Sequence, residues 1–298
     1  MKKIMVALIT PFLKDGFIDY ASLEKIVLRL LDEGIDGFIV CGTTSEVCTL
    51  SREERFQVLN YVIKLCSHRC EIWFGCGTNN TKETLELMQA SQSHEIDGYL
   101  IVTPYYNKPS DAGLYKHYER LAKQSILPIM LYNVPKRSGV CLSYPLIRKL
   151  IKHYPNITSL KQASDDYETV KKLKEEFPFF KIYCGEDAAL SSGLDAGMDG
   201  IISVSGHCYL KDIQNFIKAY QNHQPITDFD KRIKDIATTT FCDASPAPIK
   251  YILNQRGECY NVLRLPLVPI TKANKNKIDA FLHDSTKFYI SHPYTIYG

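Results

Sequence analysis

The chain has 298 residues, a formal net charge of +3, 45% hydrophobic residues and 23% charged residues. This composition is typical of a globular protein with a large core and excludes an intrinsically disordered chain. The small net charge gives no support for binding to nucleic acid or to an anionic membrane surface. No apolar run approaches the length that spans a bilayer, so we expect neither partner.

Ten cysteines are present, but none forms a CxxC pair and none has histidines at zinc-binding spacing. We therefore expect no metal site. The apolar run from Ile4 to Ile9 is too short for a secretory leader, and Pro11 interrupts it. We expect a reduced, cytoplasmic protein.

Strand and helix patterns alternate along most of the chain. Residues 4–10 form an apolar run typical of a strand that is covered on both faces. Residues 20–33 have apolar side chains at helical spacing, and Gly34 ends that helix. Further strands are predicted at 36–41, 71–76, 97–103, 128–133, 156–161, 179–184 and 199–204. Helices are predicted from Ser51, where Glu54 completes a capping box, and at 81–94, 112–125, 143–153, 166–176 and 186–196.

A short motif recurs where a predicted helix ends and a strand begins. It contains Asp-Gly followed by apolar residues, and it begins at Asp36, Asp97 and Asp199. Eight strands alternating with helices over about 220 residues fit one closed (β/α)8 TIM barrel. A doubly wound open sheet is the alternative, although no GxGxxG follows the first strand.

Beyond residue 209 the strand patterns stop. Helices are predicted at 209–222, 228–239, 246–255 and 272–289. The expected organisation is a catalytic barrel over residues 1–224 and a C-terminal helical domain over residues 225–298.

Lys161 is the most informative residue for function, because it ends a predicted buried strand. In a (β/α)8 barrel the carboxyl ends of the strands form the active site. A desolvated lysine there can attack a ketone and form a Schiff base, and Tyr132, at the end of the preceding strand, can move the protons that this requires. Taken alone, Lys161 is most simply interpreted as a solvated lysine at a strand end, and the matching chemistry at the other strand ends is what favours a catalytic role.

Four motifs resemble the dihydrodipicolinate synthase family of pyruvate-dependent class I aldolases. They are Gly42-Thr43-Thr44-Ser45-Glu46, Thr103-Pro104-Tyr105-Tyr106-Asn107, Tyr132-Asn133-Val134-Pro135-Lys136-Arg137-Ser138-Gly139 and Lys161-Gln162-Ala163-Ser164. The resemblance runs from about residue 4 to residue 285. It implies condensation of pyruvate with L-aspartate 4-semialdehyde in lysine and diaminopimelate biosynthesis, without a cofactor.

The resemblance also implies the catalytic roles. Lys161 would form the imine with pyruvate. Tyr132 would donate and accept protons, with Thr43 and Tyr106 completing a relay. In the family the residue matching Tyr106 comes from a neighbouring subunit, which implies a dimer as the minimal active unit and a homotetramer as the expected assembly.

Three further residues are implied to bind substrate. Thr43 and Thr44 would hold the pyruvate carboxylate, and the backbone carbonyl of Ile202 would line the pocket. Arg137 would bind the carboxylate of the aldehyde, since its planar donor fork matches a carboxylate. Relatives that cleave N-acetylneuraminate or ketodeoxy sugar acids share the lysine and the tyrosine but generally lack the pattern around Arg137.

Those lyases are the first alternative function. A barrel that only binds a keto acid is a second alternative, but pure binding needs no nucleophile. A barrel enzyme that acts on phosphorylated substrates is a third alternative, but the sequence contains no phosphate-binding motif.

Ser45, Gln162 and the segment 243–248 (Asp-Ala-Ser-Pro-Ala-Pro) depart from the family pattern. Ser45 replaces a usual glycine, which would strain the backbone if the position requires a positive φ. Gln162 replaces a usual glutamate after the lysine and so removes a charge near the site.

The resemblance also implies a possible allosteric site for L-lysine at Asn79, Glu83 and Tyr105. Neighbouring Arg52 and Arg55 would weaken a cationic ligand. In the alternative interpretation, Asn79 caps the following helix, Glu83 lies in its first turn and Tyr105 packs in an interface.

Overall fold

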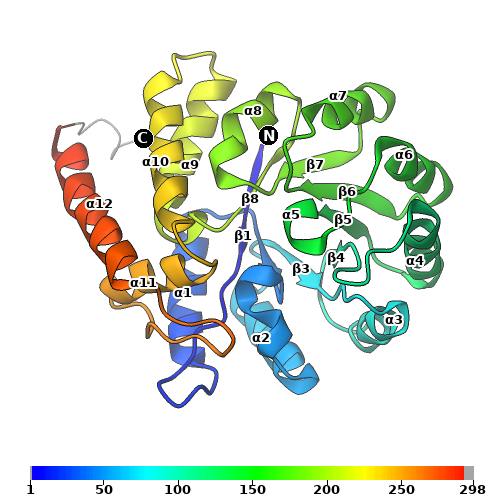
Figure 1. Ribbon diagram of the computed structural model, residues 1–298, viewed down its shortest axis with the longest axis horizontal. Helices are drawn as coiled ribbons and strands as arrows, with labels where there is room; N and C mark the ends of the chain where they lie inside the picture. The colour runs from blue at the N-terminus through cyan, green and yellow to red at the C-terminus, as the bar shows by residue number, and fades with distance from the viewer. Residues whose placement is uncertain (1, 292–298) are drawn as a thin grey trace.

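A closed barrel of eight parallel strands lies at the centre of the molecule (Figure 1). The computed structural model describes residues 2–291. The strands follow one another around the barrel in chain order, and β8 pairs with β1. They are β1 (Lys3–Ala7), β2 (Gly37–Val40), β3 (Glu71–Gly75), β4 (Gly98–Val102), β5 (Ile129–Asn133), β6 (Ile157–Gln162), β7 (Lys181–Cys184) and β8 (Gly200–Ser203). The predicted fold is confirmed, and every predicted strand is present with boundaries shifted by a few residues.

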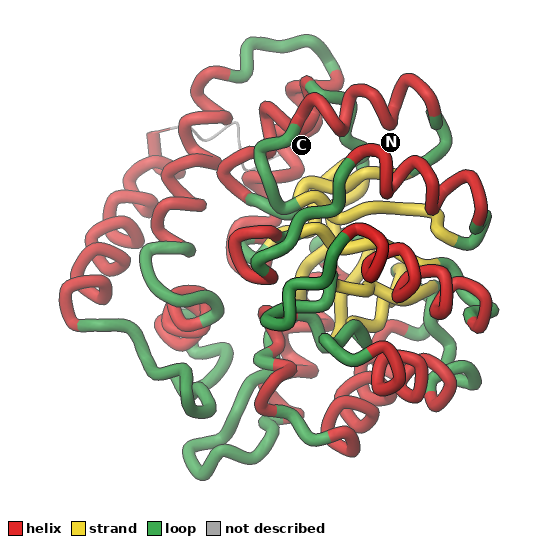
Figure 2. Tube along the Cα trace, turned by 45° about the vertical axis from the view of Figure 1, so that its right-hand side comes forward, coloured by secondary structure: helices red, strands yellow, loops and turns green. Residues whose placement is uncertain are grey.

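Helices form the outer layer around the strands, as the red and yellow segments of Figure 2 show. They are α1 (Tyr20–Asp32), α2 (Arg52–Cys66), α3 (Thr81–Ala90), α4 (Asp111–Gln124), α5 (Pro135–Ser138), α6 (Tyr144–His153), α7 (Tyr167–Glu176), α8 (Leu190–Asp195) and α9 (Gly206–Gln221). The predicted capping box of Ser51 and Glu54 opens α2. The short α5 was not predicted, because a single turn carries no helical periodicity.

Strands β2, β5 and β8 are buried along their whole length. Side chains on one face fill the barrel, and those on the other face pack under the helices. This double burial explains why the strands appear in the sequence as continuous apolar runs and not as alternating patterns.

The repeated Asp-Gly motif joins neighbouring strands at the amino end of the barrel. Each aspartate accepts a hydrogen bond from a backbone N–H near the start of the strand beside its own. The pairs are Asp36 with Ile4 at 2.7 Å, Asp97 with Ile72 at 2.7 Å and Asp199 with Ile182 at 2.9 Å. The glycine that follows allows close approach: a Cβ at Gly98 would lie 2.6 Å from the carbonyl oxygen of Pro128. The repeated Asp-Gly motif therefore marks a junction that recurs between neighbouring strands.

The C-terminal segment adds α10 (Thr227–Thr240), α11 (Ala247–Gln255) and α12 (Lys272–Ser291). Helices α10 and α11 pack against α9, and α12 packs on α10 and α11 as the outermost helix in Figure 1. Helix α9 begins three residues before its predicted start, and Tyr209 has non-helical backbone angles inside it. The helical extension is confirmed, whereas a domain boundary after residue 224 stays a prediction.

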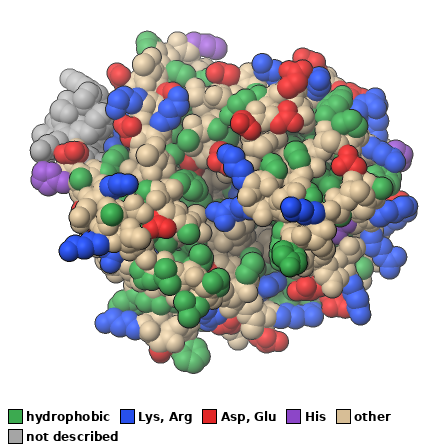
Figure 3. Space-filling view, viewed as in Figure 1, with side chains coloured by type: hydrophobic (Ala, Val, Ile, Leu, Met, Phe, Trp, Pro, Cys, Tyr) green, Lys and Arg blue, Asp and Glu red, His purple; other side chains and the backbone are tan. Residues whose placement is uncertain are grey.

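Among the described residues, no helix is both long and apolar enough to cross a membrane. Basic and acidic side chains are interspersed on the face shown in Figure 3 and do not form one continuous field of a single sign.

Candidate active site

A cavity of about 320 Å³ opens at the carboxyl ends of β2 to β5. This is the end of a (β/α)8 barrel at which active sites form. Segments from the C-terminal extension complete its wall. Its lining includes Thr43, Glu46, Cys48, Tyr105, Tyr132 and Arg137.

Lys161 and Tyr132 lie side by side in neighbouring strands. The two residues are paired in the register of β5 and β6, and each is 6% exposed. The Lys161 Nζ atom lies 4.5 Å from the centre of the Tyr132 ring. The predicted proximity of the two side chains is confirmed. Burial of this kind keeps water away from an amine and suits a nucleophile.

Gly185 makes room for the lysine side chain. A Cβ at this position would lie 3.1 Å from Cε of Lys161 and 2.9 Å from Cβ of Ala163. No role was predicted for Gly185, because a glycine after a strand has no chemical signature. Its lack of a side chain is what allows Lys161 its present conformation.

Thr43 and Thr44 lie in a 3-10 turn, Thr43–Ser45, directly after β2. Thr43 is exposed and lines the cavity, whereas Thr44 is buried. The positive φ angles in this loop belong to Cys41, at 59°, and to Glu46, at 56°. Ser45 lies outside that region, so its replacement of glycine causes no such strain, and its hydroxyl donates to the carbonyl of Leu8 at 2.7 Å.

Arg137 lies in the short helix α5, directly after β5. Proline at its first position favours this turn, and Gly139 ends it with a φ of 75°. The Arg137 side chain is exposed and lines the cavity. Within the described part of the chain it has no carboxylate partner. Its charge is therefore available to an anionic ligand.

Six of the predicted site residues are not among those that line this cavity in the single chain: Lys161, Thr44, Ile202, Tyr106, Asn79 and Glu83. Ile202 is 1% exposed in β8. Tyr106 is 89% exposed and has a φ of 74°. An aromatic residue is strained in this region of backbone angles, and such strain persists only where the surroundings enforce it.

Gln162, next to the lysine, is held by hydrogen bonds at both ends of its amide. It accepts from Asn133 Nδ2 at 3.0 Å and donates to Ser164 Oγ at 2.8 Å. Asn133 in turn accepts from the N–H of Leu142 at 3.0 Å. The neutral amide thus fits a buried network in which both an acceptor and a donor are used.

The three residues of the possible allosteric site are distributed around the cavity wall and α3. Tyr105 lines the cavity, and burial, together with Cys48 and Glu83, raises its pKa. The alternative role for Asn79 is wrong: the helix cap is Asn80, whose side chain accepts from the N–H groups of Lys82 and Glu83. Glu83 does lie in the first turn of α3.

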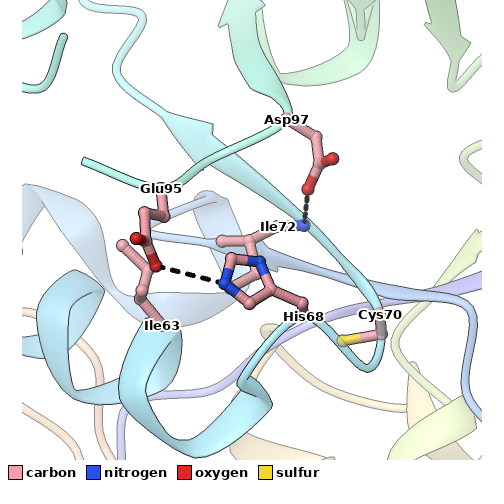
Figure 4. A pocket seen from close by; sticks show the side chains of 6 residues that line it. All are labelled: Ile63, His68, Cys70, Ile72, Glu95 and Asp97. Atoms are coloured by element: carbon pink, nitrogen blue, oxygen red, sulfur yellow. Dashed lines mark hydrogen bonds and ion pairs between the residues drawn. The ribbon is translucent and has the colours of Figure 1, made fainter. Parts of the chain in front are cut away.

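A second, smaller cavity of about 150 Å³ lies at the opposite end of the barrel, near the starts of β3 and β4 (Figure 4). There His68 Nε2 lies 3.5 Å from Glu95 Oε2. The Asp97 carboxylate accepts a hydrogen bond from the backbone N–H of Ile72. Polar groups that already bind each other at the amino end of a barrel indicate a structural role.

No group of three or more His, Cys, Asp or Glu side chains arranged to hold a metal ion occurs among the described residues. The larger cavity is lined by the phenols of Tyr105 and Tyr132, by hydroxyls that include that of Thr43 and by the guanidinium of Arg137. The buried amine of Lys161 lies beside the Tyr132 ring. This set suits covalent and acid–base chemistry on an anionic carbonyl compound.

Comparisons with known proteins find relatives that match nearly the whole chain. The model of the dihydrodipicolinate synthetase family matches residues 1–285. A 4-hydroxy-tetrahydrodipicolinate synthase from Bacillus subtilis is 36% identical over 284 residues, which cover 94% of this chain and 98% of the relative. A chloride-inhibited dihydrodipicolinate synthase from Acinetobacter baumannii, solved with pyruvate, has a TM-score of 0.91 and 35% identity, with 96% of this chain and 99% of that chain covered.

The enzyme of Cyanidioschyzon merolae, solved with lysine bound, has a TM-score of 0.90 and 32% identity, and the match covers 94% of this chain and 96% of that chain. Matches of this length and identity extend through the barrel and the C-terminal helices alike. The chain therefore belongs to the dihydrodipicolinate synthetase family.

Proposed function

We propose that the protein is a 4-hydroxy-tetrahydrodipicolinate synthase, a lyase that condenses pyruvate with L-aspartate 4-semialdehyde. The observation that carries the proposal is the buried amine of Lys161, 4.5 Å from the ring centre of Tyr132, at the cavity end of the barrel. The relative from Bacillus subtilis bears this name, and the related structure from Acinetobacter baumannii is described as a complex with pyruvate.

In this mechanism Lys161 Nζ attacks the ketone carbon of pyruvate, and loss of water gives an imine. Loss of a proton from the methyl group gives an enamine, which adds to the aldehyde carbon of the second substrate. The amine of that substrate then closes the ring at the imine carbon and releases Lys161. The sum is one product and one water from two substrates, so no cofactor is needed. Tyr132 carries protons to and from oxygen, with Thr43 and Tyr106 as its relay.

Both substrates carry a carboxylate, and the site offers a separate group to bind each one. Thr43 and Thr44 would bind the carboxylate of pyruvate, whose reacting carbon lies beside Lys161, and the backbone carbonyl of Ile202 would face the same ligand. Arg137 would bind the carboxylate of the aldehyde at the outer wall. A guanidinium forms two parallel hydrogen bonds to a carboxylate and thereby fixes its orientation.

Replacing Arg137 by alanine should lower kcat/KM for L-aspartate 4-semialdehyde by about 100-fold, because a charge-assisted bidentate contact is lost. The pyruvate concentration for half-maximal rate should change little. Steady-state assays with each substrate varied in turn measure both effects. Lys136→Ala, at the exposed neighbouring position, is the matched control and should keep normal kinetics.

An unchanged kcat/KM for the aldehyde in Arg137→Ala would contradict the substrate assignment. Assays of the wild-type protein with N-acetylneuraminate and ketodeoxy sugar acids would then test the alternative lyase activities. Neither sugar acid should be cleaved if the proposal is correct.

We further propose that a homodimer is the minimal active unit and that two dimers form a tetramer. The support is Tyr106, which is 89% exposed in the single chain although the proposed relay needs its phenol at a catalytic site. A partner subunit that receives this side chain would also enforce its strained backbone.

The ten cysteines are all unpaired, which fits a reducing cytoplasm.

L-Lysine is a proposed inhibitor that binds at Asn79, Glu83 and Tyr105. The Glu83 carboxylate can pair with an ammonium group, and the related structure from Cyanidioschyzon merolae is described with lysine bound. Millimolar L-lysine should lower the wild-type rate, and Glu83→Gln should remove this effect while leaving the uninhibited rate unchanged. Calorimetric titration that detected no binding to the wild-type protein would contradict the proposal. Glu86→Gln, one turn further along α3, is the control.

A further inference from the structure

Glu46 and Lys250 form an ion pair that is completely buried. The Lys250 Nζ atom lies 2.5 Å from Glu46 Oε1, and neither side chain is exposed to solvent. Glu46 directly follows the threonine turn Thr43–Ser45, whereas Lys250 lies in helix α11 of the C-terminal extension. The pair therefore joins the proposed pyruvate-binding loop to the part of the chain that lies outside the barrel.

Glu46 and Lys250 each form a further hydrogen bond with the backbone of the C-terminal segment. Glu46 Oε2 accepts a hydrogen bond from the backbone N–H of Arg264 at 3.0 Å. Lys250 Nζ donates to the carbonyl of Val262 at 3.0 Å and lies 4.1 Å from the centre of the Phe12 ring. Both charges are thus satisfied inside the protein.

Arg264 holds the same loop from its other side. Its guanidinium donates to the carbonyl of Thr49 at 2.9 Å and to that of Gly16 at 2.9 Å, and it pairs with Glu54 at the start of α2. Arg264 therefore contacts the loop through its backbone N–H at Glu46 and through its guanidinium at Thr49.

Glu46 is closely coupled to the threonines. Its N–H donates to the carbonyl of Thr43 at 3.1 Å and closes the turn, and its φ of 56° is unfavourable for a residue with a side chain. Glu46 also lines the cavity. A side chain that fixes this conformation also fixes the direction in which the Thr43 hydroxyl and the N–H of Thr44 point.

Stability alone does not explain such a pair. Removing two charges from water is costly, and replacing a buried ion pair by apolar residues of similar volume is often neutral or stabilising. Charged partners do, however, impose a defined geometry on the loop that carries them.

We propose that Glu46 and Lys250 are positioning residues, through which the C-terminal extension orients the threonine turn toward the carboxylate of pyruvate. This inference rests on the proposed pyruvate chemistry at Lys161 but does not depend on the identity of the aldehyde. A displacement of about 1 Å in a substrate-binding group can cost about 100-fold in rate. Loss of the pair should therefore weaken the use of pyruvate in particular.

The experiment measures the pyruvate concentration that gives half-maximal borohydride trapping on Lys161, together with Tm. Glu46→Gln should raise this concentration at least tenfold and leave the trapping amplitude at saturating pyruvate unchanged. The double variant Glu46→Gln with Lys250→Met removes both charges, so its Tm should return close to the wild-type value while the half-saturating concentration stays raised. Asp212→Asn, which breaks a pair between α9 and α10 away from the loop, should leave pyruvate binding unchanged.

The proposal would be overturned if both the Tm and the half-saturating pyruvate concentration of the double variant returned to the wild-type values. The ion pair would then act only through stability. An unchanged half-saturating concentration in a folded Glu46→Gln would overturn it as well. A wild-type protein that is trapped by pyruvate but does not turn over the aldehyde would refute the proposed function alone. A wild-type protein that is not trapped at all would refute both proposals.

Discussion

Replacing Lys161 by methionine should lower turnover by at least about a thousandfold, because the covalent route to the enamine is lost. Methionine keeps an unbranched side chain of similar length in the space beside Gly185, so the barrel should stay folded. Lys161→Arg should be equally inactive, since a guanidinium keeps its charge and cannot act as a nucleophile. Borohydride added with pyruvate should add mass to the Lys161 peptide of the wild-type protein and to no peptide of either variant.

Lys181→Met is the control for this experiment. Lys181 is an exposed strand lysine that begins β7, at the end of the barrel away from the cavity, where it pairs with Asp199. The control should keep full turnover and full labelling. Labelling of a lysine other than Lys161 in the wild-type protein, or an active Lys161→Met, would refute the Schiff-base mechanism.

Local patterns predicted the elements of this fold because the barrel is built from local units. Each strand pairs with the next strand in the chain, so the order of apolar runs is also the order around the barrel. The same property brought Tyr132 close to Lys161 in the prediction, since the two residues end consecutive strands. The position of an active-site amine could thus be predicted from strand ends alone.

Contacts between distant parts of the chain were not predictable in this way. Lys250 and Glu46 are separated by 204 residues, and each in isolation resembles an ordinary surface charge. No short-range pattern indicates that a helix of the extension contacts the threonine loop. The helix cap at Asn80 was missed for a different reason: two adjacent asparagines are equally good caps, and only the backbone angles select one.

Two tyrosines lie beside Lys161 in register and could carry its protons, and the structure distinguishes between them. Tyr132 in β5 and Tyr183 in β7 are both paired with Lys161 in register, one on each side of β6. Both rings are buried, at 6% and 5% exposure. Burial, together with Glu71, Asp199 and Asp36, raises the pKa of Tyr183, and these carboxylates belong to the amino end of the barrel. Tyr132 instead lines the cavity at the carboxyl end.

Tyr132→Phe should therefore lower kcat by about 10²- to 10⁴-fold, the usual contribution of a positioned acid–base group. The ring that packs 4.5 Å from Lys161 Nζ is retained, so the loss should come from the missing hydroxyl and not from altered packing. Imine formation should be slower, but borohydride should still label Lys161 when pyruvate is saturating and the incubation is long. Single-turnover trapping and steady-state assays separate these two effects.

Tyr183→Phe is the matched control, because it removes the same hydroxyl from the other register neighbour of the lysine. Its turnover should remain within about twofold of the wild-type value, since Tyr183 does not line the cavity and the carboxylates that raise its pKa belong to the opposite end of the barrel. Equal losses in the two variants would indicate that removing a buried hydroxyl simply disturbs the barrel. A loss confined to Tyr183→Phe would contradict the assignment of the proton carrier and would place the chemistry on the other side of Lys161.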